Sequence, residues 1–535
     1  MVLVATYFVV KVFLANSWFM EDTFIYMRIA ENFAAGYGLV YNPGEYYYNS
    51  SDFLWNLLLS TPYFLSIDPA LFVKLANGFF GCAAAVLVYL IVGRLTDRFS
   101  ALLAMILIAT HWTFFVLGQV GYMIYLTCIA ALATVYFAIR YAENPGGKSA
   151  LAAGLSLFML PLTRLDAMLP FSVLWCLMAW LTCRHGNSRK VHHLLVACAL
   201  PVLLFAGVLL GKYLYYGDIL PVGYHVKIGA KVPKDFWFYF KDGLLYNWTY
   251  LRQYGFFVFI PVAIFLAAQE YRKRKGLSHK KRKKLYPPQV DIVKFPVLIA
   301  CIAVVFLQFA YMLRTGGIVE EFRFHKVTAP FLFILIMQSM WRKRNIAVVS
   351  TVIMIGASIV HATTYKYARD GLAFAIKTTN PLEETVSGSW QSMSNQRFAE
   401  FAEFFSELPD FHPDIKIASG TGGTPAFYLR QHFVEMHGYL DTSILEDGNH
   451  YKNPGHSQHG HYLWVNPTFL LQKRVNLVFG VPHFRPKNWR KLVGGQNLAD
   501  MFFQVNGAHI IPAMPSDMQI VEFPMSDGTV LQPDT

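Results

Sequence analysis

The stretch YRKRKGLSHKKRKKLYPPQ, residues 271–289, decides how this chain is oriented and therefore how it folds. Nine of its residues are Lys or Arg, and it lies between two apolar runs, 254–268 and 295–313. Dense positive charge between apolar runs is typical of the loops that a membrane protein leaves on the cytoplasmic side. We take this stretch as the cytoplasmic reference for the rest of the chain.

The composition indicates that much of the chain lies in lipid. Hydrophobic residues make up 55% of the 535 residues and charged residues 15%, whereas soluble domains carry about 25% charged residues. The mean hydropathy of +0.36 excludes a disordered chain, a coiled coil and a soluble multidomain enzyme. The net charge of +13 does not indicate a nucleic-acid partner, because the basic residues lie mostly between apolar runs, where they meet anionic lipid headgroups.

Eleven apolar runs approach the roughly 20 residues that a helix needs to cross a bilayer. They are 2–18, 70–92, 100–117, 122–138, 149–163, 167–183, 194–213, 254–268, 295–313, 327–340 and 345–361. The sequence therefore predicts a membrane all-α fold with about 11 transmembrane helices. With that count, every loop rich in Lys and Arg falls on the side of residues 271–289, as the positive-inside rule requires.

The last part of the chain differs from the rest. Ser, Thr, Asn, His and Pro become frequent again, and strand-like runs occur at 415–418 and 475–479. We predict a transmembrane module over residues 1–367 and a soluble α/β domain over residues 368–535. The orientation given by the basic loops places this domain on the extracytoplasmic side.

Two carboxylates follow the first apolar run, in EDTFIYMRIAENF (21–33). Glu21 and Asp22 face water at the end of a predicted span, which suits a general base. The simpler interpretation is that they only mark the end of the span. The spacing from Asp22 to Arg28 suits a short amphipathic helix on the membrane surface.

A second charged motif is TRLD (163–166), which lies between two apolar runs. An ionisable residue at the centre of a membrane helix costs about 2.5–3.5 kcal/mol, so Arg164 and Asp166 are expected to be paired or functional. The alternative is an ordinary polar turn.

Two further motifs place cations on the outer side, where the positive-inside rule does not call for them. YYGDILPVGYHVK (215–227) carries His225 and Lys227, and RTGGIVEEFRFHKVTAP (314–330) carries Glu321, Arg323 and His325. Fixed cations close to the membrane plane suit a phosphate attached to a lipid. The alternative is headgroup contact without a defined site.

In this order, EDTFIYMRIAENF, GYGLVYNPGEYYYNSSDFLW (36–55), TRLD, YYGDILPVGYHVK and RFHKVTAP resemble the motifs of GT-C fold glycosyltransferases. The resemblance is to the mycobacterial terminal β-(1→2) arabinofuranosyltransferase and its bacterial relatives. It continues in GTGGTPAFYLRQHFVEMHGYLD (420–441) and NPGHSQHGHYLW (453–464). The sequence departs from that family at Glu21, where an Asp is usual, and around Asn49. The identity of the sugar that those enzymes transfer is therefore not assigned to this chain.

The resemblance implies an inverting enzyme of the bacterial inner (plasma) membrane that transfers a sugar from a polyprenyl-phosphate donor to a hydroxyl of a cell-envelope glycan or glycolipid. Asp22 would be the general base, with Glu21 beside it. No cofactor is required and no metal ligands are expected, although a divalent cation is left open. The residues expected to hold the substrates are Arg28, Asn49, Arg164, Asp166, His225, Lys227, Glu321, Arg323 and His325.

Two other functions stay open. The chain could be a transporter or flippase of a lipid-linked sugar, although transporters usually contain internal repeats and no motif occurs twice here. It could also be a protein O-glycosyltransferase of the same fold, in which case the acceptor would be a protein.

Overall fold

The computed structural model places most of the transmembrane part and a portion of the tail. The described residues are 6–7, 19, 21–119, 121, 124–184, 190–226, 236–275, 288–317, 322–364, 416–420, 422–446, 448–452, 463–465, 467–475, 477–479, 510–512 and 519–522. The predicted first span, 2–18, is almost entirely outside these residues, as are Lys227 and Glu321.

The described residues in the first half of the chain are mostly helical, and the helix α2 among them carries the acid pair. The elements in order are α2 (Glu21–Ala34), α3 (Phe53–Phe64), α4 (Pro69–Leu95), α5 (Arg98–Thr110), α6 (Trp112–Gln119), α7 (Ile124–Glu143), α8 (Gly147–Thr163), the 3-10 turn η2 (Leu165–Ala167), α9 (Met168–Arg184), α10 (Lys190–Leu194), the π-helical turn η3 (Leu195–Ala199) and α11 (Leu200–Tyr216). Glu21 and Asp22 lie in the first turn of α2, where carboxylates are favoured by the helix dipole.

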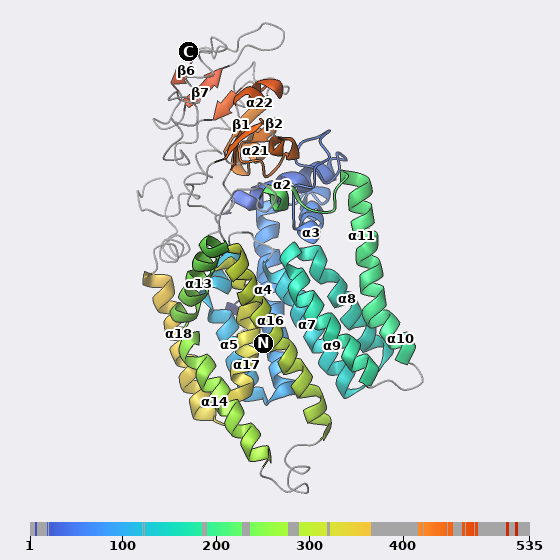
Figure 1. Cartoon of the computed structure of the whole chain (residues 1–535), viewed down its shortest axis with the longest axis vertical. Helices are drawn as coiled ribbons and strands as arrows, with labels where there is room; N and C mark the ends of the chain where they lie inside the picture. Colours follow the sequence, from blue (N-terminus) through green and yellow to red (C-terminus); the bar gives the residue numbers. More distant parts are fainter. Residues whose placement is uncertain are drawn as a thin grey trace.

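The second half completes the helical bundle. Its elements are α12 (Val222–Tyr224), α13 (Phe236–Gln253), α14 (Phe256–Lys275), α16 (Pro288–Thr315), the 3-10 turn η5 (Arg323–His325), α17 (Thr328–Met340) and α18 (Arg344–Thr364). Most of them run along the long axis of the molecule, and α2 and α3 lie at one end of the bundle (Figure 1).

Within the described residues, six helices are long and apolar enough to cross a membrane, and up to eight if each of two bent pairs is one span. The bends are 54° between α5 and α6 and 77° between α13 and α14. Two of the eleven predicted spans, 149–163 and 327–340, form the shorter helices α8 and α17, of 17 and 13 residues. The chain thus has the helices of a multi-pass membrane protein, while the count of eleven stays a prediction.

Helix α13 differs from the prediction, which left residues 216–253 as an outer loop. Its sequence, FWFYFKDGLLYNWTYLRQ, interleaves aromatic and polar residues, so that no continuous apolar run reveals it. Gly243 lies so close to the backbone of Met312 in α16 that an added Cβ would clash. The two helices therefore pack backbone to backbone at that point.

Basic residues of the predicted cytoplasmic loops make contacts at one end of the bundle. Arg94 pairs with Glu143, Arg342 pairs with Glu270, and Arg344 lies over the ring of Phe99. These contacts bring the predicted cytoplasmic loops together at one end. The C-terminal strands lie beyond the other end, next to α2 (Figure 1).

The described part of the tail combines short strands and helices. Its elements are β1 (Lys416–Ser419), α21 (Thr424–Leu429), β2 (His432–Glu435), η6 (Thr442–Leu445), β3 (His450–Lys452), β4 (Leu463–Val465), α22 (Pro467–Gln472), β5 (Leu477–Phe479), β6 (Ile510–Pro512) and β7 (Gln519–Glu522). Five strands form a mixed sheet in the order β2-β1-β5-β7-β6, in which β1 is parallel to both of its neighbours. Strands β3 and β4 form a separate antiparallel pair. The expected mixture of strands and helices is present there, while the domain boundary at 367/368 stays a prediction.

Close helix packing predicts a position-dependent response to adding one methyl group. Gly154 of α8 would place a Cβ against the carbonyl oxygen of Val196 in η3, whereas a Cβ on Gly207 of α11 meets no atom within 4 Å. Both Gly→Ala changes gain the same helix propensity, so their difference isolates packing. We expect Gly154→Ala to destabilise the detergent-solubilised protein by about 1–3 kcal/mol relative to Gly207→Ala. Equal melting temperatures of the two variants would contradict close α8–η3 contact.

Candidate active site

Asp22 forms an ion pair at the end of the bundle nearest the sheet. Its carboxylate oxygen Oδ2 lies 3.3 Å from Nη1 of Arg323 in η5, 301 residues away in the sequence. The Asp22 side chain is 43% exposed, and that of Arg323 19%. The structure therefore joins two predicted site residues and leaves the carboxylate of Asp22 accessible to a ligand.

Beside this pair lies a chain of alternating charges. Arg164 donates from Nε to Asp166 at 3.0 Å, and its Nη1 lies 3.5 Å from the carboxylate of Asp52. The ammonium of Lys326 lies 3.5 Å from the other oxygen of Asp166. Asp52, Asp166 and Lys326 are almost fully buried. We call Asp52, Arg164, Asp166 and Lys326 the charge chain.

Electrostatic contacts link the charge chain to Asp22. Tyr26, one turn after Asp22 on α2, is buried, and burial together with the charges of Asp52 and Asp22 raises its pKa well above the usual value. Arg164 and Arg323 are close enough for their charges to repel. Burial, followed by the charge of Arg164, lowers the pKa of Lys326 to about 8. Three cations and three carboxylates therefore occupy one region.

Glu21 faces away from this region and binds the tail. Its Oε1 accepts from the backbone N–H groups of Gly423 (2.6 Å) and Thr424 (3.0 Å), and its Oε2 accepts from the Thr424 hydroxyl (2.7 Å). Burial raises the pKa of Glu21 despite these donors. Adjacent residues of a helix point about 100° apart, which explains how Glu21 and Asp22 serve different partners.

Arg28 and Asn49, both expected to bind substrate, are occupied by backbone acceptors. Arg28 donates from Nε to Tyr41 O (2.8 Å), from Nη2 to Gln431 O (2.6 Å) and from Nη1 to Ala426 O. Asn49 donates to the carbonyl of Leu440. Both side chains connect α2 and the loop between α2 and α3 to the tail. Their contact with substrate stays a prediction.

Asn42 adds a contact that resembles strand pairing. Its Oδ1 accepts from the backbone N–H of Phe433 (3.1 Å), and its Nδ2 donates to the carbonyl of the same residue (2.9 Å). Phe433 lies in β2, the edge strand of the sheet. One side chain therefore satisfies both backbone groups of a residue on that edge.

The two predicted histidines form no ion pair with the residues of the charge chain in the part of the protein that the structure describes. His325 is fully buried, its ring is stacked between Tyr250 (4.1 Å) and Tyr246 (5.2 Å), and burial lowers its pKa to about 3. A neutral ring in an aromatic stack anchors the neighbouring Arg323 and Lys326. His225 pairs locally with Asp218 at 2.8 Å.

The predicted site residues did not include three residues that the structure places near the site. Asp52 and Lys326 complete the charge chain, and Lys212 of α11 is buried with its ammonium 2.6 Å from the Tyr48 hydroxyl and 4.3 Å from the Tyr48 ring centroid. Lys212 had a sequence signal, since it is a lysine inside an apolar run. Asp52 and Lys326 had none beyond their places within recognised motifs.

A metal site would bring several His, Cys, Asp or Glu side chains together in the structure. Among the residues that it describes, no group of three or more His, Cys, Asp or Glu side chains could hold a metal ion. His456, His459 and His461 of the NPGHSQHGHYLW segment lie outside those residues. Metal dependence therefore stays an open question.

Two solved structures are similar to this chain in fold. One is ArnT from Cupriavidus metallidurans bound to undecaprenyl phosphate, with a TM-score of 0.50 and 12% identity, covering 97% of this chain and 96% of that chain. Another is the apo oligosaccharyltransferase from Archaeoglobus fulgidus, with a TM-score of 0.50 and 12% identity, covering 95% of this chain and 72% of that chain. At this identity the likeness describes the fold, and the resemblance to arabinofuranosyltransferases stays a prediction.

Comparisons at the level of sequence give no match. No model of a protein family matches this chain, and no curated protein does.

The contact between Glu21 and Thr424 predicts how firmly the tail is held. Thr424→Val removes a hydroxyl donor to a carboxylate, a class of hydrogen bond that contributes about 1.5–3 kcal/mol. We expect faster hydrogen exchange over 422–435 in this variant, measured by mass spectrometry. Thr442→Val is the matched control, because Thr442 lies in η6 and the hydroxyl that donates to Glu21 is that of Thr424. Unchanged exchange in Thr424→Val would show that Glu21 does not hold the tail.

The buried carboxyl of Glu435 predicts how the stability of the tail depends on pH. Burial raises the pKa of Glu435 to about 8, although backbone N–H groups of Tyr439 and His437 donate to it. Because its usual pKa is about 4.3, the folded protein keeps a proton that the unfolded chain releases. Stability should therefore fall as the pH rises from about 4.5 to 8. Melting temperatures across this range should fall less steeply in Glu435→Gln, whereas Glu446→Gln, at an exposed position, should retain the slope.

Proposed function

We propose that this chain is an integral membrane glycosyltransferase that takes a sugar from a polyprenyl-phosphate donor and transfers it, with inversion, to a hydroxyl of a cell-envelope glycan or glycolipid on the outer face of the membrane. The observation that carries the proposal is the accessible Asp22 carboxylate, paired with Arg323 beside the charge chain. The fold shared with GT-C glycosyltransferases supports the class of reaction.

Asp22 is the proposed general base. A base must be accessible to the acceptor and within hydrogen-bond reach of the proton that it accepts. Asp22 meets the first requirement with a side chain that is 43% exposed, whereas Glu21 is bonded to Gly423 and Thr424. Arg323 holds the Asp22 carboxylate in one orientation.

The cations of the site would bind the donor phosphate. Negative charge develops on the lipid phosphate as the sugar leaves, and fixed guanidinium groups stabilise such charge most effectively where water is restricted. Arg323 and Arg164 are both mostly buried, with side chains 19% and 21% exposed. Asp52 and Asp166 would keep Arg164 in place between substrate turnovers.

The proposed step is a direct displacement. The acceptor oxygen forms a bond to the anomeric carbon while the bond from that carbon to the phosphate oxygen breaks. The electron pair of the broken bond leaves with the polyprenyl phosphate, and the hydroxyl proton passes to Asp22. One negative charge thus moves from Asp22 to the lipid phosphate, close to the arginines, and no nucleotide or redox partner is needed.

The acceptor separates this proposal from its nearest alternative. The likeness in fold to an archaeal oligosaccharyltransferase supports a second candidate, in which the acceptor is a protein. The donor chemistry is common to both candidates. A third candidate, a flippase of lipid-linked sugars, would form no glycosidic bond.

Replacement of the base tests the proposal. We expect Asp22→Asn to reduce transfer from a panel of polyprenyl-phosphate sugars at least 100-fold, since general bases contribute about 10²–10⁴-fold. Products would be identified by mass spectrometry after incubating the purified protein with glycan, glycolipid and peptide acceptors. The melting temperature should stay near that of the parent protein, because the Asp22 side chain is exposed and its ion pair is worth at most about 1 kcal/mol.

Glu143→Gln is the matched control, because Glu143 also pairs with an arginine but lies at the opposite end of the bundle. It should retain full transfer. Normal turnover by Asp22→Asn would exclude Asp22 as the base. Movement of labelled lipid across vesicles without any new glycosidic bond would instead identify a flippase.

A further inference from the structure

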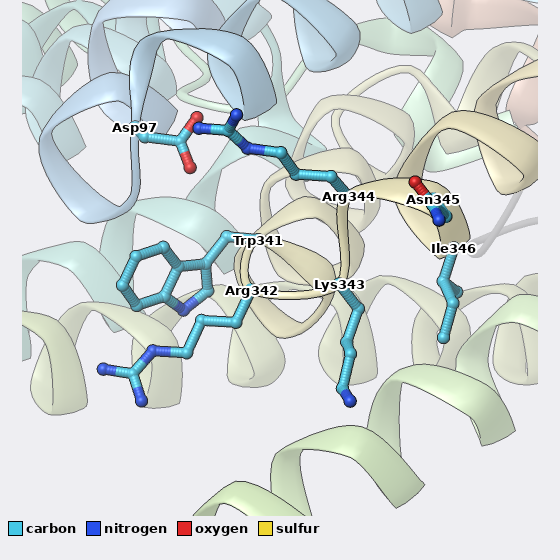
Figure 2. A pocket seen from close by; sticks show the side chains of 7 residues that line it. All are labelled: Asp97, Trp341, Arg342, Lys343, Arg344, Asn345 and Ile346. Carbon is cyan, nitrogen blue, oxygen red and sulfur yellow. The ribbon is translucent and has the colours of Figure 1, made fainter.

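An open pocket lies at the basic end of the bundle, away from the proposed active site. It has a volume of about 800 Å³ and is lined by Asp97 and by residues 341–346, which form the turn between α17 and α18 and the start of α18 (Figure 2). This volume is within the range of about 300–1,000 Å³ that is typical of ligand sites. The pocket therefore has room for a lipid headgroup.

Positive charge dominates the lining. Arg342, Lys343 and Arg344 contribute three cations, and Asp97 is the one acidic residue among the lining residues. The Asp97 carboxylate caps α5, since its Oδ1 accepts from the backbone N–H groups of Phe99 (2.8 Å) and Ser100 (2.9 Å). It keeps its single negative charge, and the Arg344 side chain points toward it (Figure 2). The pocket thus carries excess positive charge that its own acid does not compensate.

The three cations differ in their partners. Arg342 forms an ion pair with Glu270 at 2.7 Å and lies over the Trp341 ring at 4.7 Å. Arg344 lies over the Phe99 ring at 5.5 Å. In the part of the chain that the structure describes, neither Lys343 nor Arg344 forms an ion pair. These two residues are the cations that can accept an external anion.

The position of the pocket selects the kind of anion. The turn joins two apolar helices, so it lies where the bundle leaves the hydrocarbon, and Trp341 is a residue typical of that interface. Basic pockets between transmembrane helices on the cytoplasmic side bind anionic lipid headgroups. Lysine and arginine donors match the oxygens of a phosphodiester.

We propose that this pocket binds the headgroup phosphate of an anionic phospholipid from the leaflet at the basic end of the protein. Lys343 and Arg344 donate to the phosphate oxygens, while Arg342, held by Glu270, keeps Trp341 at the rim. The lipid binds the α17–α18 turn to the membrane surface. The inference does not depend on the proposed glycosyl transfer.

Native mass spectrometry of the full chain tests the proposal. The protein in mild detergent is supplied with phosphatidylglycerol or with phosphatidylcholine of the same acyl chains, and the bound lipids are counted. We expect the parent protein to retain phosphatidylglycerol in preference to phosphatidylcholine. In the double variant Lys343→Gln/Arg344→Gln, the ratio of bound phosphatidylglycerol to bound phosphatidylcholine should be at least tenfold smaller. Both side chains are exposed, so melting temperatures should change little.

The matched control is Arg140→Gln/Lys148→Gln, which removes two exposed cations from the same end of the bundle but outside the pocket. It should retain the preference for phosphatidylglycerol. An equal loss in both double variants would overturn the proposal, because it would show that only the general positive charge of this end attracts lipid. Displacement of the lipid by millimolar inorganic phosphate would also overturn it, since the site would then bind a free anion.

Quenching of tryptophan fluorescence gives a second measurement that does not depend on removing charge. Brominated phosphatidylglycerol should quench the parent protein more strongly than it quenches Trp341→Phe, because Trp341 lines the pocket. Equal quenching in the two proteins would place the lipid elsewhere and contradict the proposal.

Discussion

The alternation of charge from Asp52 through Arg164 and Asp166 to Lys326 is the interaction on which the arrangement of this site depends. Three of these side chains are almost fully buried, and each would be strongly unfavourable alone at the end of a membrane bundle. Together they connect the residue before α3, the turn between α8 and α9, and the start of α17. Removing one partner of such a buried pair typically costs about 3–5 kcal/mol, because the other charge is then left unpaired.

Much of the architecture could be predicted because hydrophobicity and charge act locally. A run such as 70–92 has few alternatives to a membrane helix, and α4 covers it fully. The TRLD motif was recognised because two ionisable residues between apolar runs need partners. The identity of those partners was not predictable, since Asp52 lies 112 residues before Arg164 and Lys326 lies 160 residues after Asp166, and only folding brings them together.

The adjacent acids Glu21 and Asp22 show a second limit of reasoning from sequence. Both occur in one motif and both could be a base, and the pattern does not say which way each points. The structure separates them through the tail: Glu21 binds Thr424, and Arg28 and Asn42 bind the segment around β2. Residues some 400 positions apart thus fix the helix that carries Asp22, which no local pattern could indicate.

The contact of Asn42 with Phe433 has a consequence for how copies of this protein behave. An edge strand offers unpaired N–H and C=O groups to any extended segment that approaches, and this is a common start of aggregation. On β2 an amide side chain from the first loop already occupies both groups of the middle of the strand. The loop that follows the helix of the acid pair thereby also shields the sheet. A substitution of Asn42 would leave these backbone groups unpaired, so that two molecules could associate through hydrogen bonds between their β2 strands.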